Sequence, residues 1–153
     1  MDDKYLRLAI QESRESVVEG GFPVGVILVA KDRVLATGIS NGKQLNDPTS
    51  HGEISAIRKA CAALQTRQLG NVTLYSSMEP CLMCYSACIW ASIPKIVYAG
   101  TRRHLSLIHF EGTHDLSQIN SQSRKPIQLI HNEMMEPEAL SIVKQWEDNQ
   151  RSN

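Results

Sequence analysis

The sequence predicts an α/β protein in which a mixed β-sheet lies between two layers of helices. Short apolar runs typical of strands alternate with longer segments whose apolar residues recur every three or four positions, as on one face of a helix. The first two strand-like runs are separated by a short turn and so form an antiparallel hairpin, whereas later strands are joined through helices. The expected architecture is therefore a three-layer α/β/α sandwich around a mixed sheet.

The expected elements follow one another along the whole chain. Helical periodicity is seen in residues 3–19, 52–69, 81–91 and from 136 onward. Strand-like runs cover residues 24–30, 34–36, 72–75, 96–98 and 127–130. Residues 81–91 are apolar nearly all round, which predicts a helix buried on every side. Residues 41–50 have the composition of a loop, and residues 101–123 show no clear pattern. Without repeats or linkers, residues 1–153 are expected to form one domain.

Composition limits the classes of partner. The chain has 153 residues, of which 42% are hydrophobic, so a single core can form without disulfides or a structural metal. A metal site would therefore serve chemistry. The 16 basic and 16 acidic residues balance, whereas proteins that grip nucleic acid usually carry a basic excess. Residues 131–150 contain five acidic residues and one lysine. These charges favour a small-molecule partner over nucleic acid.

The N-terminal residues Met1-Asp2-Asp3-Lys4 do not resemble a signal peptide, and the apolar runs are too short to span a bilayer. We therefore expect a cytoplasmic protein with no membrane partner. In a reducing compartment the four cysteines are more often free, catalytic or metal-bound than bridged.

Two residue clusters can carry chemistry, and both lie where a helix is expected to begin. The first contains His51 and Glu53, and the second contains Cys81 and Cys84 directly after Pro80. Zinc prefers thiolate and imidazole ligands, and a catalytic zinc site supplies three of them and leaves the fourth position to water. Cysteines three residues apart in a first helical turn can converge on one ion, and the helix N-terminus favours thiolates.

In this interpretation His51, Cys81 and Cys84 hold one Zn²⁺ per chain, and Glu53 is the catalytic acid and base. Each motif alone has another interpretation. The residues from Ser50 to Glu53 also fit a capping box, in which Glu53 only ties back the helix start. The two cysteines alone fit a redox pair or half of a structural zinc site.

The other cysteines and histidines of the sequence do not extend this cluster. Cys61 and Cys88 lie within apolar helix patterns and are expected in the core. The remaining histidines show no ligand spacing with the cluster and are expected to be surface or structural residues: His104, His109, His114 and His131. Glu111 and Asp115 are further candidate acids in the unassigned segment.

His-x-Glu followed by Pro-Cys-x-x-Cys is the signature of zinc nucleobase deaminases, and the chain resembles the cytidine-deaminase superfamily from about residue 3 to 100, with a weaker tail to Asp148. Residues 46–61 (NDPTSHGEISAIRKAC) are similar to bacterial guanine deaminases. Residues 74–84 (LYSSMEPCLMC) are shared in style with guanine and tRNA adenosine deaminases. The His-Gly-Glu form of the first motif, with glycine in the middle, is similar to that of fungal cytosine deaminase.

The resemblance implies a five-stranded sheet and a homodimer whose active site lies near the interface. It also implies substrate contacts at six positions: Val24, Asn41, Gly52, Trp90, Trp146 and Asp148. The resemblance implies that Asn41 hydrogen-bonds the base, that Val24 forms an apolar wall, and that the Gly52 N–H anchors a substrate carbonyl. Trp90 is expected either to form a further wall of the pocket or to pack in the hydrophobic core. Trp146 and Asp148 close the pocket or simply belong to a solvated helix end.

The sequence thus predicts hydrolytic deamination of a small nucleobase of the guanine or cytosine kind, or of its nucleoside. The nearest alternative is a tRNA-specific adenosine deaminase, which requires a grip on a polyanion and predicts a basic C-terminal helix. A non-enzymatic alternative is a zinc-binding interaction module on the same fold, although such a module has no need of Glu53.

Overall fold

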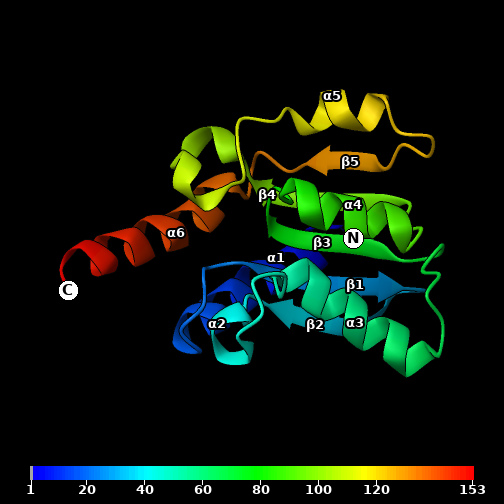
Figure 1. The fold of residues 1–153 in the computed structure, drawn as a ribbon, viewed down its shortest axis with the longest axis horizontal. Helices are drawn as coiled ribbons and strands as arrows, with labels where there is room; N and C mark the ends of the chain where they lie inside the picture. The colour runs from blue at the N-terminus through cyan, green and yellow to red at the C-terminus, as the bar shows by residue number, and fades with distance from the viewer. Residues whose placement is uncertain (1) are drawn as a thin grey trace.

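The computed structural model describes residues 2–153 and contains a five-stranded sheet with the order β2-β1-β3-β4-β5 (Figure 1). Its strands are β1 (Gly25–Ala30), β2 (Arg33–Ile39), β3 (Thr73–Met78), β4 (Lys95–Gly100) and β5 (Gln128–His131). Strand β1 pairs antiparallel with both β2 and β3, whereas β3, β4 and β5 run parallel. The mixed sheet predicted from the hairpin and the helical crossovers is therefore confirmed.

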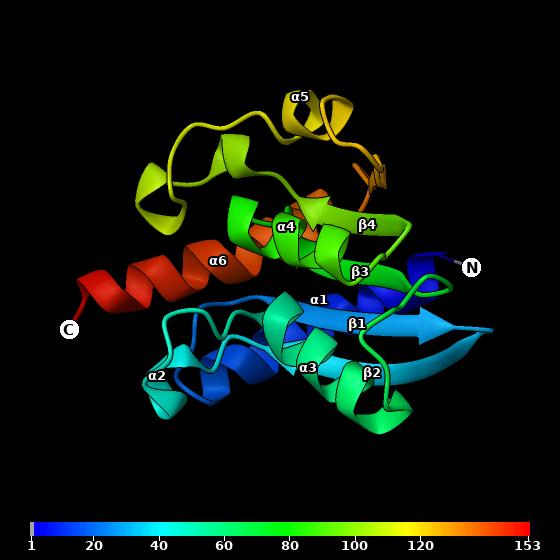
Figure 2. The same ribbon diagram turned by 45° about the vertical axis from the view of Figure 1, so that its right-hand side comes forward.

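Helices cover both faces of this sheet (Figure 2). They are α1 (Asp2–Val18), α2 (Gly42–Leu45), α3 (Gly52–Leu64), α4 (Leu82–Trp90), α5 (Leu116–Ser121) and α6 (Glu136–Arg151). Helices α1 and α6 contact each other and one face of the sheet, and α3 and α4 contact each other on the opposite face. Within residues 2–153, none of these helices has the length and apolar character needed to cross a lipid bilayer.

The core lies on both faces of the central strands. Leu6 and Ile10 of α1, Leu28 of β1, Leu74 of β3 and Ile96 of β4 are fully buried. Burying each such side chain contributes about 1.5–3 kcal/mol to folding. Because every residue of β1 except the last is buried, the strand carries the continuous apolar run that a strand covered on both faces requires.

Helix α3 packs unusually close to β2, and glycine allows it. A Cβ atom built on Gly38 of β2 would lie 2.0 Å from the carbonyl oxygen of Gly52, the first residue of α3. Only a residue without a side chain lets these two backbones touch. The contact fixes where α3 begins, directly after His51.

Several boundaries differ from those predicted. Strand β3 continues three residues beyond Tyr75, because the polar Ser76 and Ser77 are buried within the sheet and the Ser77 hydroxyl accepts a hydrogen bond from the Gly25 N–H at 3.1 Å. Helix α3 ends at Leu64, where Gln65 adopts a left-handed conformation. The loop predicted for residues 41–50 contains the short helix α2.

Two further differences concern regions that the sequence pattern described poorly. Helix α4 is not buried all round, because Trp90 at its end is 83% exposed. The unassigned residues 101–123 form two short 3-10 helices, η1 (Arg102–His104) and η2 (Leu107–His109), followed by α5. A short 3-10 turn has no apolar periodicity that a sequence window could detect.

Candidate active site

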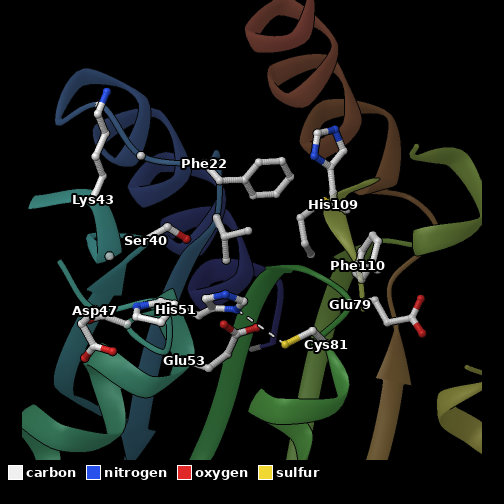
Figure 3. A pocket seen from close by; sticks show the side chains of 17 residues that line it. Phe22, Ser40, Lys43, Asp47, His51, Glu53, Glu79, Cys81, His109 and Phe110 are labelled. Atoms are coloured by element: carbon white, nitrogen blue, oxygen red, sulfur yellow. Dashed lines mark hydrogen bonds between the residues drawn. The ribbon is translucent and has the colours of Figure 1, made fainter. Parts of the chain in front are cut away.

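Helices α3 and α4 begin side by side at the floor of a pocket (Figure 3). The residue before each helix is an N-cap in an extended conformation, His51 with φ −72° and ψ 167° and Cys81 with φ −69° and ψ 168°. Because both residues are N-caps, their side chains lie beside the free N–H groups of the first turns. The positive ends of two helix dipoles therefore face the same place and favour thiolates there.

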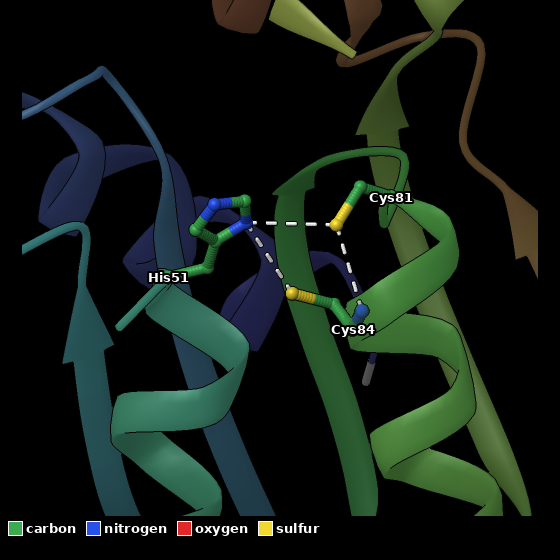
Figure 4. A group of neighbouring side chains, drawn as sticks. All are labelled: His51, Cys81 and Cys84. Atoms are coloured by element: carbon green, nitrogen blue, oxygen red, sulfur yellow. Dashed lines mark hydrogen bonds between the residues drawn. The ribbon is translucent and has the colours of Figure 1, made fainter. Parts of the chain in front are cut away.

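His51, Cys81 and Cys84 converge at this place (Figure 4). His51 Nδ1 lies 3.5 Å from Cys81 Sγ and 3.6 Å from Cys84 Sγ, and all three ligand atoms lie within 4.8 Å of one another. Zn–S and Zn–N bonds of about 2.3 and 2.05 Å at a tetrahedral angle place sulfur and nitrogen about 3.6 Å apart. Both nitrogen–sulfur distances therefore match those expected around one zinc ion.

The electrostatics of the two cysteines also suit a cation. The hydrogen bond with the Cys84 thiol, followed by the one with His51, lowers the pKa of Cys81 to about 5. The same shared proton, together with burial, raises the pKa of Cys84. The Cys84 N–H donates to Cys81 Sγ at 3.5 Å, which further favours the Cys81 thiolate. A cation held by these three side chains would displace the shared proton and favour both thiolates and a neutral imidazole.

Glu53 lines the same pocket, two residues beyond His51, and only 3% of it is exposed. Burial, and next the nearby Cys81, raises the pKa of Glu53 to about 7. The capping box that could have explained this residue is not formed. His51 is the N-cap and makes no side-chain cap hydrogen bond, and the Ser50 hydroxyl instead donates to Asn41 Oδ1 at 2.6 Å. Glu53 is therefore a buried acid that does not take part in a capping box with Ser50.

The pocket above these residues has a volume of about 350 Å³. Its floor is formed by His51, Glu53, Met78 and Cys81. Its mouth is bordered by Phe22, from the segment before β1, and by His109 and Phe110, from the segment after β4 (Figure 3). A cavity of this size accommodates a single small ring.

Helix α6 supports the mouth of the pocket from behind. The His109 ring lies 4.8 Å from the Phe22 ring and 5.7 Å from the Trp146 ring, measured between centroids. His109 Nε2 pairs with Glu147 Oε1 at 2.7 Å. Of the two roles expected for His109, surface or structural, the structure shows the structural one, and it adds that His109 lines the pocket. No spacing rule could have found it, because its partner lies 38 positions away.

Three predicted substrate contacts lie around the floor of the pocket. Val24 lines the pocket. Asn41 is adjacent to lining residues, but its side-chain oxygen is occupied by the Ser50 hydroxyl, and it does not belong to the described lining. Gly52 is buried, and a Cβ atom at this position would lie 3.3 Å from Val24 Cγ1.

The three contacts predicted from the later helices lie farther away. Trp90 borders other surface cavities and, in the described chain, does not reach this pocket. Trp146 lies behind the mouth, where its ring contacts Phe22 at 5.2 Å. Asp148 is exposed, and the neighbouring Glu147 is the acid that approaches the mouth through His109.

Comparisons with known proteins agree with this geometry. The family profile of the cytidine and deoxycytidylate deaminase zinc-binding region matches residues 1–100. The chain is 34% identical over 124 residues to guanine deaminase of Bacillus subtilis, covering 80% of each protein. It is 34% identical over 95 residues to tRNA-specific adenosine deaminase of Aquifex aeolicus, covering 62% of this chain and 63% of that protein.

A solved structure from a study of tRNA:A34 deaminases superposes with a TM-score of 0.78 at 29% identity, covering 92% of this chain and 99% of the other. The family profile matches 100 of the 153 residues, and three side chains that can bind zinc converge where the sequence motifs predict. The chain therefore belongs to the cytidine and deoxycytidylate deaminase zinc-binding family.

Proposed function

We propose that this protein is a zinc-dependent hydrolytic deaminase of a small nucleobase of the guanine or cytosine type, taken as the base or its nucleoside. The observation that carries the proposal is the convergence of His51, Cys81 and Cys84 beside the buried Glu53 at the floor of one pocket. In this proposal the whole chain, residues 1–153, acts as one deaminase domain.

The reaction replaces an exocyclic amine by a carbonyl. His51, Cys81 and Cys84 would hold the zinc ion, which when bound would supply a water of lowered pKa, available as hydroxide near neutral pH. Glu53 accepts the proton from this water on its carboxylate and delivers it to the ring nitrogen as oxygen adds to the carbon bearing the amine. Glu53 then carries the remaining hydroxyl proton to the amine, the C–N bond breaks, and ammonia leaves.

The charges around the pocket favour a neutral base over a polyanion. Of the described lining residues, Lys43 is a permanent cation, whereas Asp47, Glu53 and Glu79 are acids. Phosphate contacts from lysine and arginine dominate nucleic-acid affinity. The pocket and the acidic pair of α6, Glu147 and Asp148, offer few such contacts.

A tRNA-specific adenosine deaminase is the second candidate, and the comparisons support it as strongly. The relatives include proteins named for either activity, at similar identity. The two candidates differ in what must lie outside the pocket, because a tRNA substrate needs a basic surface around the mouth. Helix α6 carries four acidic and two basic residues, which does not provide that surface.

The deciding experiment is ammonia release from a panel of guanine, cytosine, adenine and their nucleosides, with Glu53→Ala as the matched inactive control. We expect turnover of at least one small substrate. A flat result across the panel, together with inosine formation in tRNA, would replace the proposal by the tRNA activity. No turnover of any substrate by the zinc-loaded protein would instead support an interaction module.

A salt titration of tRNA binding separates the candidates independently of activity. A tRNA enzyme loses affinity steeply as salt rises, because binding releases counterions from the phosphates. We expect only weak binding at low salt. Submicromolar binding with a steep salt slope would contradict the preference for a small base.

We also infer a homodimer formed through the outer face of α4. Trp90 is largely exposed there, and a shallow cavity beside it is lined by Ile57, Cys61 and Ala87. Large exposed apolar patches usually mark interaction surfaces. Sedimentation of the purified protein should give a dimer, and Trp90→Glu should shift it toward the monomer.

The four free cysteines are consistent with a reducing, cytoplasmic location.

A further inference from the structure

We propose that Arg102 is a positioning residue for the zinc ligand Cys81 and joins the loop before Cys81 to the segment that walls the pocket. The inference rests on the proposed function, because it concerns the same metal site. Arg102 is the first residue of η1, two positions after the last residue of β4, and its sequence neighbourhood carries no motif that points to a role at the site.

Arg102 holds the two residues that precede Cys81. Its Nε donates to Glu79 Oε1 at 3.1 Å, and its backbone N–H donates to Glu79 Oε2 at 3.0 Å. Its Nη2 donates to the carbonyl oxygen of Pro80 at 2.9 Å. This carbonyl belongs to the peptide bond between Pro80 and Cys81. The hydrogen bond therefore holds the backbone directly before a proposed zinc ligand.

The same guanidinium also holds the opposite wall. It lies over the Phe110 ring, 4.8 Å from the ring centroid, and Phe110 lines the pocket mouth. Its Nη1 lies 3.9 Å from Glu111 Oε1, and that oxygen accepts a hydrogen bond from the Leu82 N–H at 2.8 Å. Since Leu82 is the first residue of α4, Glu111 connects the pocket wall to the helix that carries both zinc-binding cysteines.

The burial of Arg102 shows that these contacts are not incidental surface pairs. Only 9% of the Arg102 side chain and 10% of the Glu79 side chain is exposed. A buried charge persists only when it is paired and hydrogen-bonded. Among the described residues, Nη1 of Arg102 is buried without a hydrogen-bond partner, so the other donors and the two carboxylates must hold this charge in place.

Removing the guanidinium leaves the buried Glu79 carboxylate with the backbone N–H of residue 102 but without its cationic partner, and it frees the Pro80 carbonyl. The N-cap conformation of Cys81 then loses its brace, and Cys81 Sγ is no longer held 3.5 Å from His51 Nδ1. Partners that orient metal ligands typically change metal affinity about 10- to 100-fold when mutated. We therefore expect that an Arg102 substitution primarily lowers the affinity for zinc.

The test compares Arg102→Met with Arg103→Met. Arg103 is the exposed neighbour on η1, so both variants remove one positive charge at nearly the same place. Zinc affinity is measured by competition with a chromophoric chelator, and the thiolate-to-cobalt absorption of the Co²⁺-loaded protein reports the geometry at the cysteines. We expect Arg102→Met to bind zinc about 10- to 100-fold more weakly with an altered cobalt spectrum, and Arg103→Met to match the parent protein.

Arg102→Lys keeps the charge but cannot donate to Glu79 and Pro80 together, so it should show the same loss to a smaller extent. It also serves if Arg102→Met does not fold, as judged by circular dichroism of the metal-free protein. Unchanged zinc affinity and cobalt spectrum in a folded Arg102 variant would overturn the inference, even if the parent protein deaminates bases. If the parent protein deaminates nothing but the Arg102 variants still bind zinc more weakly than the parent, this inference is retained and the proposed function is rejected.

Discussion

The floor and the mouth of the pocket are built in different ways. The floor takes its ligands from two short motifs, residues 51–53 and 80–84, each placed by the start of one helix. The mouth is assembled from segments distant in the sequence: Phe22 and His109 border it, and Trp146 of α6 packs behind them. Local backbone geometry therefore places the residues that would do the chemistry, whereas long-range packing places the residues that enclose the substrate.

This difference teaches where each kind of change should act. Three ligands and one acid at the floor form a unit in which every member is needed. The mouth residues share one task, the enclosure of a bound ring, so the loss of one leaves the others in place. Substitutions at the floor should abolish zinc binding or turnover, and substitutions at the mouth should change substrate affinity.

The largest expected effect follows from Cys84→Ser. A serine hydroxyl is a poor zinc ligand, so the zinc content should fall from about one per chain to near zero, and turnover should disappear with it. Cys61→Ser, which changes a half-buried cysteine elsewhere on α3, is the control and should keep its zinc. Metal analysis of both purified variants decides the matter, and stoichiometric zinc in Cys84→Ser would mean that the ligand set is different.

Zinc removal should leave the fold intact, because neither Cys81 nor Cys84 belongs to the hydrophobic core cluster. We expect the metal-free protein to keep its far-ultraviolet circular dichroism and to melt at a lower temperature, since zinc binds only the folded state. Loss of helical signal on chelation would show that the metal is needed for folding, and the division between floor and core would be wrong.

Glu53→Ala should separate chemistry from metal binding. Zinc should remain, because Glu53 is not one of the three converging ligands, while kcat should fall about 10²- to 10⁴-fold as proton transfer is lost. Glu133→Ala removes an exposed acid before α6 and should have no effect. Near-normal turnover by a zinc-loaded Glu53→Ala protein would contradict the assigned role.

His109→Ala tests the mouth. Removing the imidazole opens the wall between Phe22 and α6, so we expect KM to rise roughly 10-fold with kcat changed much less and zinc content unchanged. Steady-state kinetics with the best substrate of the panel measures both constants. A collapse of kcat with an unaltered KM would place His109 in the chemistry and erase the distinction between the two regions.

The smallest expected effect comes from two neighbouring acids of α6. Glu147→Gln removes the charge that pairs with His109 at 2.7 Å, and KM should rise about threefold because a neutral partner holds the imidazole less firmly. Asp148→Asn removes an exposed charge and should leave the kinetics unchanged. The reverse order of effects would favour Asp148, the acid that the sequence resemblance implies.

The success of sequence reasoning followed the same division. The motif around Cys81 and Cys84 led to ligands that do converge, because residues one helical turn apart share a face whatever surrounds them. Trp90 shows where a local pattern fails. Trp90 lies in an apolar pattern that predicts burial, yet it is exposed, because the pattern cannot tell whether another element covers that face.

The sequence by itself determined the alternation of helices and strands, the mixed sheet, and the three residues that converge as candidate zinc ligands. These depend on local periodicity and on the chemistry of thiolate and imidazole. Only the tertiary structure decided that His109 meets Glu147 at the mouth and that Arg102 braces the residues before Cys81. Such contacts join segments 20 or more positions apart, and no local pattern specifies them because the whole sheet must form before those side chains can meet.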